Sequence, residues 1–199
     1  MELNLNELQI DALKEIGNIG AGNAATALSQ LINKKVDMSV PQLDILEFSD
    51  MIKRVGNEDD EVVAVLLKVF GDIQGNILFL VKNEEAQKFF DTLMFGFSDI
   101  NEEMFYSMFQ EIGNILGNSY LNAVSQITNL SLLTSVPSVA YDMLAAVMTT
   151  TFIDAEQYSD LILAIDTKFI IDNNEIAGNF FFIPKPGTFN FILKKLGLC

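Results

Sequence analysis

The sequence contains no histidine and no tryptophan, and its only cysteine is Cys199. A single cysteine cannot form an intrachain disulfide, and nothing else in the composition points to an oxidising compartment. The scarcity of histidine and cysteine removes the usual zinc ligands. It also removes every arrangement in which a histidine activates a serine or cysteine nucleophile.

Basic residues are also scarce, with 12 lysines and arginines against 27 acidic residues and a formal net charge of −15. Nucleic acids and anionic membrane surfaces are bound through clusters of lysine and arginine, so neither is an expected partner. No group of carboxylates has the spacing of a dedicated metal site, and we expect no metal or cofactor of the protein's own. The acidic residues are more simply explained as a solvated surface.

The sequence has no recognisable secretory signal, because residues 1–9 contain two glutamates and neither a basic nor an apolar segment. A cytoplasmic location is therefore expected. Residues 112–141 carry no charge, but polar side chains interrupt them every few positions and Pro137 breaks them, so we expect no membrane span. Half of the 199 residues are hydrophobic, which favours a stable globular fold.

An internal repeat is the most informative feature that is present. Glu-Ile-Gly-Asn at residues 15–18 returns at residues 111–114. Aligning residues 15–41 with residues 111–137 gives identity at twelve of 27 positions without a gap. We interpret this as a tandem duplication.

The two halves have the same predicted order of elements. Half-repeat 1 covers about residues 6–96 and half-repeat 2 about residues 101–197, and each begins with a helix capped by Asn6 or Asn101. An extended segment with Val-Pro follows, then two strands and a closing helix. The predicted strands are residues 61–70, 73–81, 161–171 and 176–183, the closing helices residues 84–95 and 189–196, and an additional short helix residues 142–150.

These patterns predict one α/β domain over residues 1–199 with internal pseudo-twofold symmetry, in which two helix-three-strand-helix halves share a β-sheet. The two long first helices, which carry the motif, would lie on its surface. Two independent domains are the alternative. It is less favoured because each half would be small and no linker-like composition separates the halves.

Helical periodicity assigns the motif residues to faces, since residues three or four positions apart share one side of a helix. The outward stripe of the first helix is predicted to hold Asp11, Glu15, Asn18, Gly22 and Ser29. The inward face is predicted to hold Leu13, Ile16, Gly20, Ala24, Ala27 and Leu31. The outward stripe of the second helix is predicted to hold Ser107, Glu111, Asn114, Asn118 and Ser125.

An outward Glu-Asn pair on a single helix is usually only a solvated surface. Here the pair is identical in both halves, although apolar positions have diverged, as Gly20 against Leu116 and Ala24 against Tyr120 show. A function for the pair is therefore favoured. An inherited relic of the duplication is the alternative.

Glycines interrupt both helices, although each costs about 1 kcal/mol relative to alanine in a helix. Close packing of the two helices on each other would explain Gly17 and Gly113, which lie off the polar stripe. Gly22 lies on the stripe. Either packing or the close approach of a partner could require it.

These residues resemble the CheC, CheX and FliY family of chemotaxis phosphatases. The family signature is Asp or Ser, three residues, Glu, two residues, Asn, and a proline some two dozen positions later. The first half matches it with Asp11, Glu15, Asn18 and Pro41, and the second half with Ser107, Glu111, Asn114 and Pro137. The likeness extends over almost the whole chain.

The resemblance implies a phosphatase that hydrolyses the aspartyl phosphate of CheY or a related response regulator. Asn18 and Asn114 would each hold a water molecule in line with the phosphorus. Glu15 and Glu111 would pair with the lysine that response regulators keep beside their phosphoaspartate. Mg²⁺ would belong to the regulator.

The roles of three further residues are left open by the resemblance. Asp11 and Ser107 lie one turn before the glutamates and would support either them or the local backbone. Residues 141–148 resemble the family's docking segment for CheD, a receptor deamidase, which makes Asp142 a candidate contact. A packed helix is the alternative for that segment. The alternative function is a binding module for the phosphorylated regulator or CheD without useful turnover, and we expect a monomer.

Overall fold

The computed structural model describes residues 6–40, 42–93, 101–154, 161–171 and 173–198. The helices in these residues are α1 (Glu7–Ile32), α2 (Phe48–Val55), α3 (Asn83–Leu93), α4 (Glu102–Thr128), α5 (Leu144–Asp154) and α6 (Thr188–Lys195). The strands are β1 (Val36–Ser39), β2 (Leu43–Glu47), β3 (Glu61–Gly71), β4 (Gly75–Lys82), β5 (Leu132–Thr134), β6 (Ser138–Met143), β7 (Leu161–Ile171) and β8 (Asn174–Pro184). Pro41 of the family signature and the end of the predicted helix over residues 84–95 lie outside the described residues.

The two halves share one order of elements, helix-strand-strand-helix-strand-strand-helix, over the described residues. The prediction of three strands in each half was wrong, because each half has four. In the second half the extended segment is split into β5 and β6 around Pro137, since proline has no N–H to donate and a fixed φ. Helix α2 was not predicted. The duplication itself stays a prediction.

One antiparallel sheet contains strands from both halves, in the order β1-β7-β8-β4-β3-β5. Strands β1 and β2 of the first half both pair along β7 of the second half, and β5 and β6 of the second half both pair along β3 of the first. The pairing of β4 with β8 joins the two halves at the centre. Because each half donates strands to the other, the prediction of a shared sheet is confirmed.

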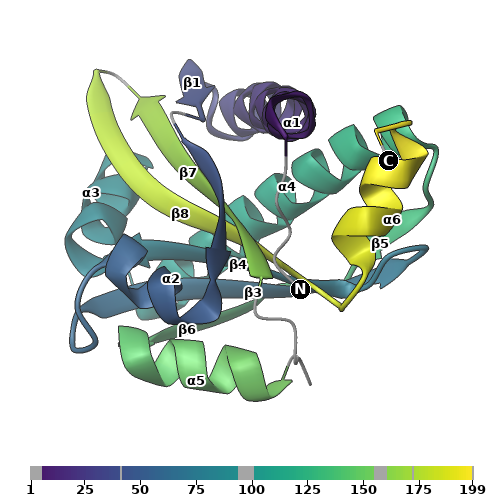
Figure 1. Ribbon diagram of the computed structural model, residues 1–199. Coiled ribbons are helices and arrows are strands. Elements are labelled where there is room, and N and C mark those ends of the chain that lie inside the picture. Colours follow the sequence, from purple (N-terminus) through teal and green to yellow (C-terminus); the bar gives the residue numbers. More distant parts are fainter. Residues whose placement is uncertain (1–5, 41, 94–100, 155–160, 172, 199) are drawn as a thin grey trace.

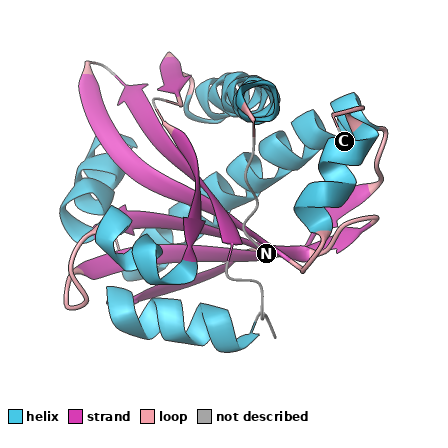
Figure 2. Cartoon of the chain, in the orientation of Figure 1, coloured by secondary structure: helices cyan, strands magenta, loops and turns pink. Residues whose placement is uncertain are grey.

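Helices cover both faces of this curled sheet (Figures 1 and 2). Side chains of a strand alternate between faces, so on β4 Ile77 and Phe79 enter the core under α1, α3, α4 and α6, whereas Leu78 and Leu80 enter the core under α2 and α5. Helices α1 and α4 lie side by side in one layer. The two copies of the motif are therefore on the same side of the sheet.

Candidate functional site

Capping fixes where the two motif helices begin and end. The side chain of Asn6 accepts a hydrogen bond from the Gln9 backbone N–H (2.9 Å), and Gln9 Oε1 accepts one from the Asn6 N–H (2.9 Å). Asn101 accepts from the Met104 N–H (2.9 Å) at the start of α4. Both predicted starts are confirmed. The ends, Asn33 and Asn129, are left-handed residues with φ of 52° and 54°, a conformation that asparagine tolerates well.

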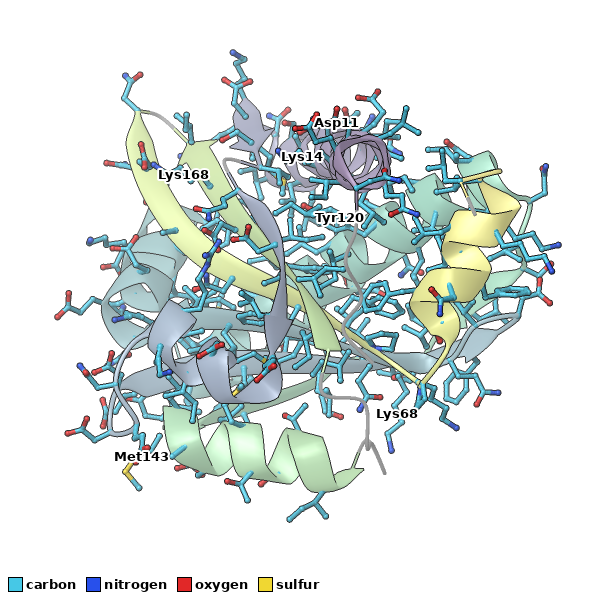
Figure 3. All side chains as sticks on the ribbon, viewed as in Figure 1. Asp11, Lys14, Lys68, Tyr120, Met143 and Lys168 are labelled. Carbon is cyan, nitrogen blue, oxygen red and sulfur yellow. The ribbon has the colours of Figure 1, made fainter. Side chains whose placement is uncertain are left out.

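The outward stripe of α1 is largely as predicted. Asp11, Glu15, Asn18 and Gly22 are exposed, whereas Leu13, Ile16, Gly20 and Ala24 are buried. Figure 3 shows Asp11 on the side of α1 that faces away from the sheet. The stripe therefore presents a carboxylate and an amide to solvent.

The predicted faces fail at the end of α1. Leu31 was predicted to point inward but is 54% exposed. Ser29 was predicted to point outward but is half-buried, because its hydroxyl group accepts a hydrogen bond from the Val36 N–H (2.9 Å) and donates to the Ala25 carbonyl (2.7 Å). The edge strand β1 packs against this flank of the helix.

The corresponding stripe of α4 is less open. Ser107 and Glu111 are exposed, but Asn114 and Asn118 are half-buried. Asn118 Nδ2 donates to both the Asn114 side-chain Oδ1 and the Asn114 backbone carbonyl, each at 2.8 Å. The two asparagines of the motif are therefore in different environments.

The glutamates of the motif have no counter-ion among the described residues. Within that part of the chain, the side chains of Asp11, Glu15, Ser107 and Glu111 make no hydrogen bond and no ion pair. Other acidic groups are paired: Lys82 bonds Asp60 at 2.8 Å, which holds the pKa of Asp60 below its usual value. The unpaired carboxylates of the motif are thus available to pair with a positively charged side chain of a partner. The predicted support of the glutamates by Asp11 and Ser107 is not seen as a direct contact.

The aromatic ring of Tyr120 joins the two motif helices to the sheet. It stacks against Phe180 of β8 with ring centroids 4.4 Å apart, and a Cβ atom at Gly20 of α1 would lie 2.5 Å from Tyr120 Cδ1. Burial raises the pKa of Tyr120 to about 12, and its hydroxyl group has no hydrogen-bond partner in the described residues. Tyr120 is therefore neutral at physiological pH and acts as a packing residue (Figure 3).

Packing explains most of the helix glycines. A Cβ at Gly113 would lie 2.3 Å from Val65 Cγ1, and one at Gly117 would lie 2.9 Å from Leu67 Cδ2. The close neighbour of both glycines is thus β3. The prediction that Gly113 packs against the other motif helix was wrong. A Cβ at Gly17 would only make an ordinary contact with Leu43 at 3.5 Å. Gly22 has nothing within 4 Å, so packing within this chain does not require it.

Alanine at two glycines of α1 should have opposite effects on stability. Gly22→Ala should raise the free energy of unfolding by about 0.5–1 kcal/mol, because alanine is the better helix former and the site is open. Gly20→Ala should lower it by about 1–3 kcal/mol, because the methyl group overlaps the Tyr120 ring. Urea unfolding followed by circular dichroism measures both. A loss of stability in Gly22→Ala would show that the site is not open.

Asp142 lies in β6 and not in a helix, because α5 begins at Leu144. The predicted helix over residues 142–150 was wrong for its first two residues. Asp142 is exposed, and its Oδ1 accepts a hydrogen bond from the Met143 N–H (2.7 Å). Figure 3 shows Met143, which is 51% exposed, beside α5 and away from α1. Asp142 is therefore not part of the motif surface.

None of the helices in the described residues is long and apolar enough to cross a membrane. No group of three or more acidic or cysteine side chains in the same residues is placed to hold a metal ion.

The fold is shared with solved structures of FliY and of a CheX-CheY complex. FliY of Thermotoga maritima has this fold, with a TM-score of 0.78, 17% identity and 98% of each chain covered. A chain of the CheX-CheY-BeF3-Mg²⁺ complex from Borrelia burgdorferi also matches, with a TM-score of 0.51, 13% identity, and coverage of 83% of this chain and 96% of that one.

Sequence similarity identifies the family. The chain is 34% identical to the CheY-P phosphatase CheC of Bacillus subtilis, over 97% of this chain and 96% of the relative. The model of the CheC-like family matches residues 8–45, which contain the first Glu-Asn motif. The protein belongs to the CheC family.

Proposed function

We propose that this protein hydrolyses the aspartyl phosphate of a CheY-type response regulator, using the outward faces of α1 and α4. The observation that carries the proposal is the repeated Glu-Asn pair, with exposed carboxylates that have no partner in the described chain. The similarity to a CheY-P phosphatase over nearly the whole chain supports it.

The residue types suit this reaction. An acyl phosphate is already activated, so catalysis needs a water molecule held in line with the phosphorus more than it needs a strong base. An amide cannot act as a general base, but its carbonyl accepts a hydrogen bond from water and its NH2 group donates one. Asn18 and Asn114 have this role in the proposal.

Glu15 and Glu111 provide the docking contact in the proposal. Each is exposed on the same helical face as its asparagine, one turn earlier. A lysine of the regulator beside the phosphoaspartate would pair with the carboxylate and set the register of the two proteins. The regulator would also carry the Mg²⁺ that neutralises the phosphoryl oxygens.

A binding module without turnover is the alternative, either for the phosphorylated regulator or for CheD through Asp142. Asp142, which is exposed and lines a surface groove with Ala146 and Thr150 of α5, offers a second surface for such a partner. Asp142→Lys distinguishes the roles of the two surfaces. It should leave phosphate release unchanged, because Asp142 does not belong to the Glu-Asn pairs.

Phosphate release from a CheY-type regulator phosphorylated on aspartate tests the proposal. Substoichiometric protein should clear an excess of phosphorylated regulator faster than the regulator's own decay, because an enzyme turns over repeatedly. A binding module would protect the phosphate or leave its decay unchanged. Either of those two results would contradict the proposal.

A further inference from the structure

The hydrogen bonds around Asn114 fix the orientation of its side chain. Asn118, one turn later on α4, uses Nδ2 to donate to the Asn114 backbone carbonyl and to Asn114 Oδ1. A backbone carbonyl can only accept a hydrogen bond, so the group of Asn118 beside it must be the NH2 group. One of its hydrogens serves the backbone and the other serves Oδ1. The NH2 group of Asn114 therefore lies on the side away from Asn118.

A strand residue holds Asn118 in turn. The Thr134 hydroxyl group of β5 donates to Asn118 Oδ1 at 3.2 Å. With both ends of its amide bonded, Asn118 has its acceptor toward β5 and its donors toward Asn114. A chain of hydrogen bonds thus runs from the sheet edge to the asparagine of the α4 motif.

Helix α1 lacks both supporting residues. In the alignment of the two halves, Gly22 occupies the place of Asn118 and Met38 the place of Thr134. Glycine has no side chain, and a thioether has no hydrogen to donate. Asn18 is exposed, and its side chain makes no hydrogen bond in the described part of the chain. Its amide is free to turn.

We infer that Asn118, held by Thr134, is a positioning residue that preorganises Asn114, so that the α4 site is the faster of two unequal sites. The inference rests on the proposed function. A preset amide needs no ordering when the phosphorylated regulator docks. One acceptor position of Oδ1 and both hydrogens of the Asn114 NH2 group stay available for water and phosphoryl oxygens. Asn18 has to lose its rotamer freedom at that step, which costs about a tenfold factor in rate.

Kinetics of single-site proteins test the inference. In the Asn18→Ala background only the α4 site operates, and there Asn118→Gly should lower kcat about tenfold with little change in KM, because the amide still binds but is no longer preset. Asn118→Asp keeps the shape of the side chain but has no NH2 group to donate a hydrogen bond, and it should lower kcat at least as much. Thr134→Val should lower kcat less than Asn118→Gly does. A protein with both substitutions should have the same kcat as the protein with Asn118→Gly alone.

The control for helix propensity is Asn122→Gly, since Asn122 is exposed on α4 one turn further along. It carries the same cost in helix stability and should leave kcat unchanged. A loss in Asn118→Gly no larger than in this control would overturn the inference. An α4 site that is slower than the α1 site of the Asn114→Ala protein would overturn it as well.

Side-chain ¹⁵N relaxation in the free protein separates failure of the inference from failure of the proposed function. The NH2 group of Asn114 should be more ordered than that of Asn18, and Asn118→Gly should remove the difference. Equal mobility in the unsubstituted protein would overturn the inference whatever the kinetics show. An ordered Asn114 in a protein without phosphatase activity would support the positioning and overturn the proposed function.

Discussion

Replacing Asn18 and Asn114 together with alanine is expected to slow hydrolysis by about 100-fold or more, to near the regulator's intrinsic rate, because positioning of the attacking water is lost. Binding of the regulator should change little, since the glutamates remain. Both asparagines lie on helix surfaces, where alanine favours the helix. The stability of the fold should therefore be retained.

The matched control is Asn23→Ala with Asn122→Ala. These two asparagines are exposed on the same helices, but neither belongs to a Glu-Asn pair: Asn23 lies to the side of the α1 stripe, and Asn122 lies two turns beyond Asn114. Their replacement should leave the turnover unchanged. If the double variant at Asn18 and Asn114 hydrolysed the phosphate at the rate of the unsubstituted protein, the amides would have no catalytic role. Stopped-flow detection of released phosphate measures all of these rates.

Reversing the charge at both glutamates, Glu15→Lys with Glu111→Lys, is expected to weaken regulator binding by about 100-fold or more, because an attraction to a lysine becomes a repulsion. Neither carboxylate has a partner in the described chain, so the fold loses no ion pair. Titration calorimetry with a beryllofluoride-loaded regulator, which mimics the phosphorylated form without hydrolysis, measures the affinity.

The control is Glu58→Lys with Glu84→Lys, which changes the net charge by the same amount as Glu15→Lys with Glu111→Lys. Glu58 and Glu84 are exposed and lie outside the motif helices. The control should weaken regulator binding far less than the motif variant does. The difference in affinity between these two proteins should shrink as the salt concentration rises. An equal loss of affinity in both proteins would show that overall charge and not the motif decides binding.

The site could be predicted from local sequence because its signals are local. Asn6 and Asn101 mark where the helices begin, and from there helical periodicity is enough to place Glu15, Asn18 and Glu111 on an outward face. The periodicity fails where a distant segment covers a helix. Ser29 is drawn into contact with Val36 in β1, and no pattern within α1 indicates it.

The sheet could be predicted only in part, because strand partners are set over long distances. The apolar runs of β3, β4, β7 and β8 are evident in the sequence, but the pairing of β1 and β2 with β7 crosses more than half of the chain. The contact of Thr134 with Asn118 was missed, because it depends on where β5 lies once it pairs with β3. Helix α2 was missed because its first residues have no side-chain cap.

The most direct test of the account locates the docked regulator. The single cysteine, Cys199, allows a Cys199→Ser background in which one fluorescent label is placed at Asn23→Cys on α1, Asn122→Cys on α4 or Thr149→Cys on α5, all exposed positions. Addition of beryllofluoride-loaded regulator should change the emission of the labels on α1 and α4 and leave the α5 label unchanged. A response confined to the α5 label would contradict the account.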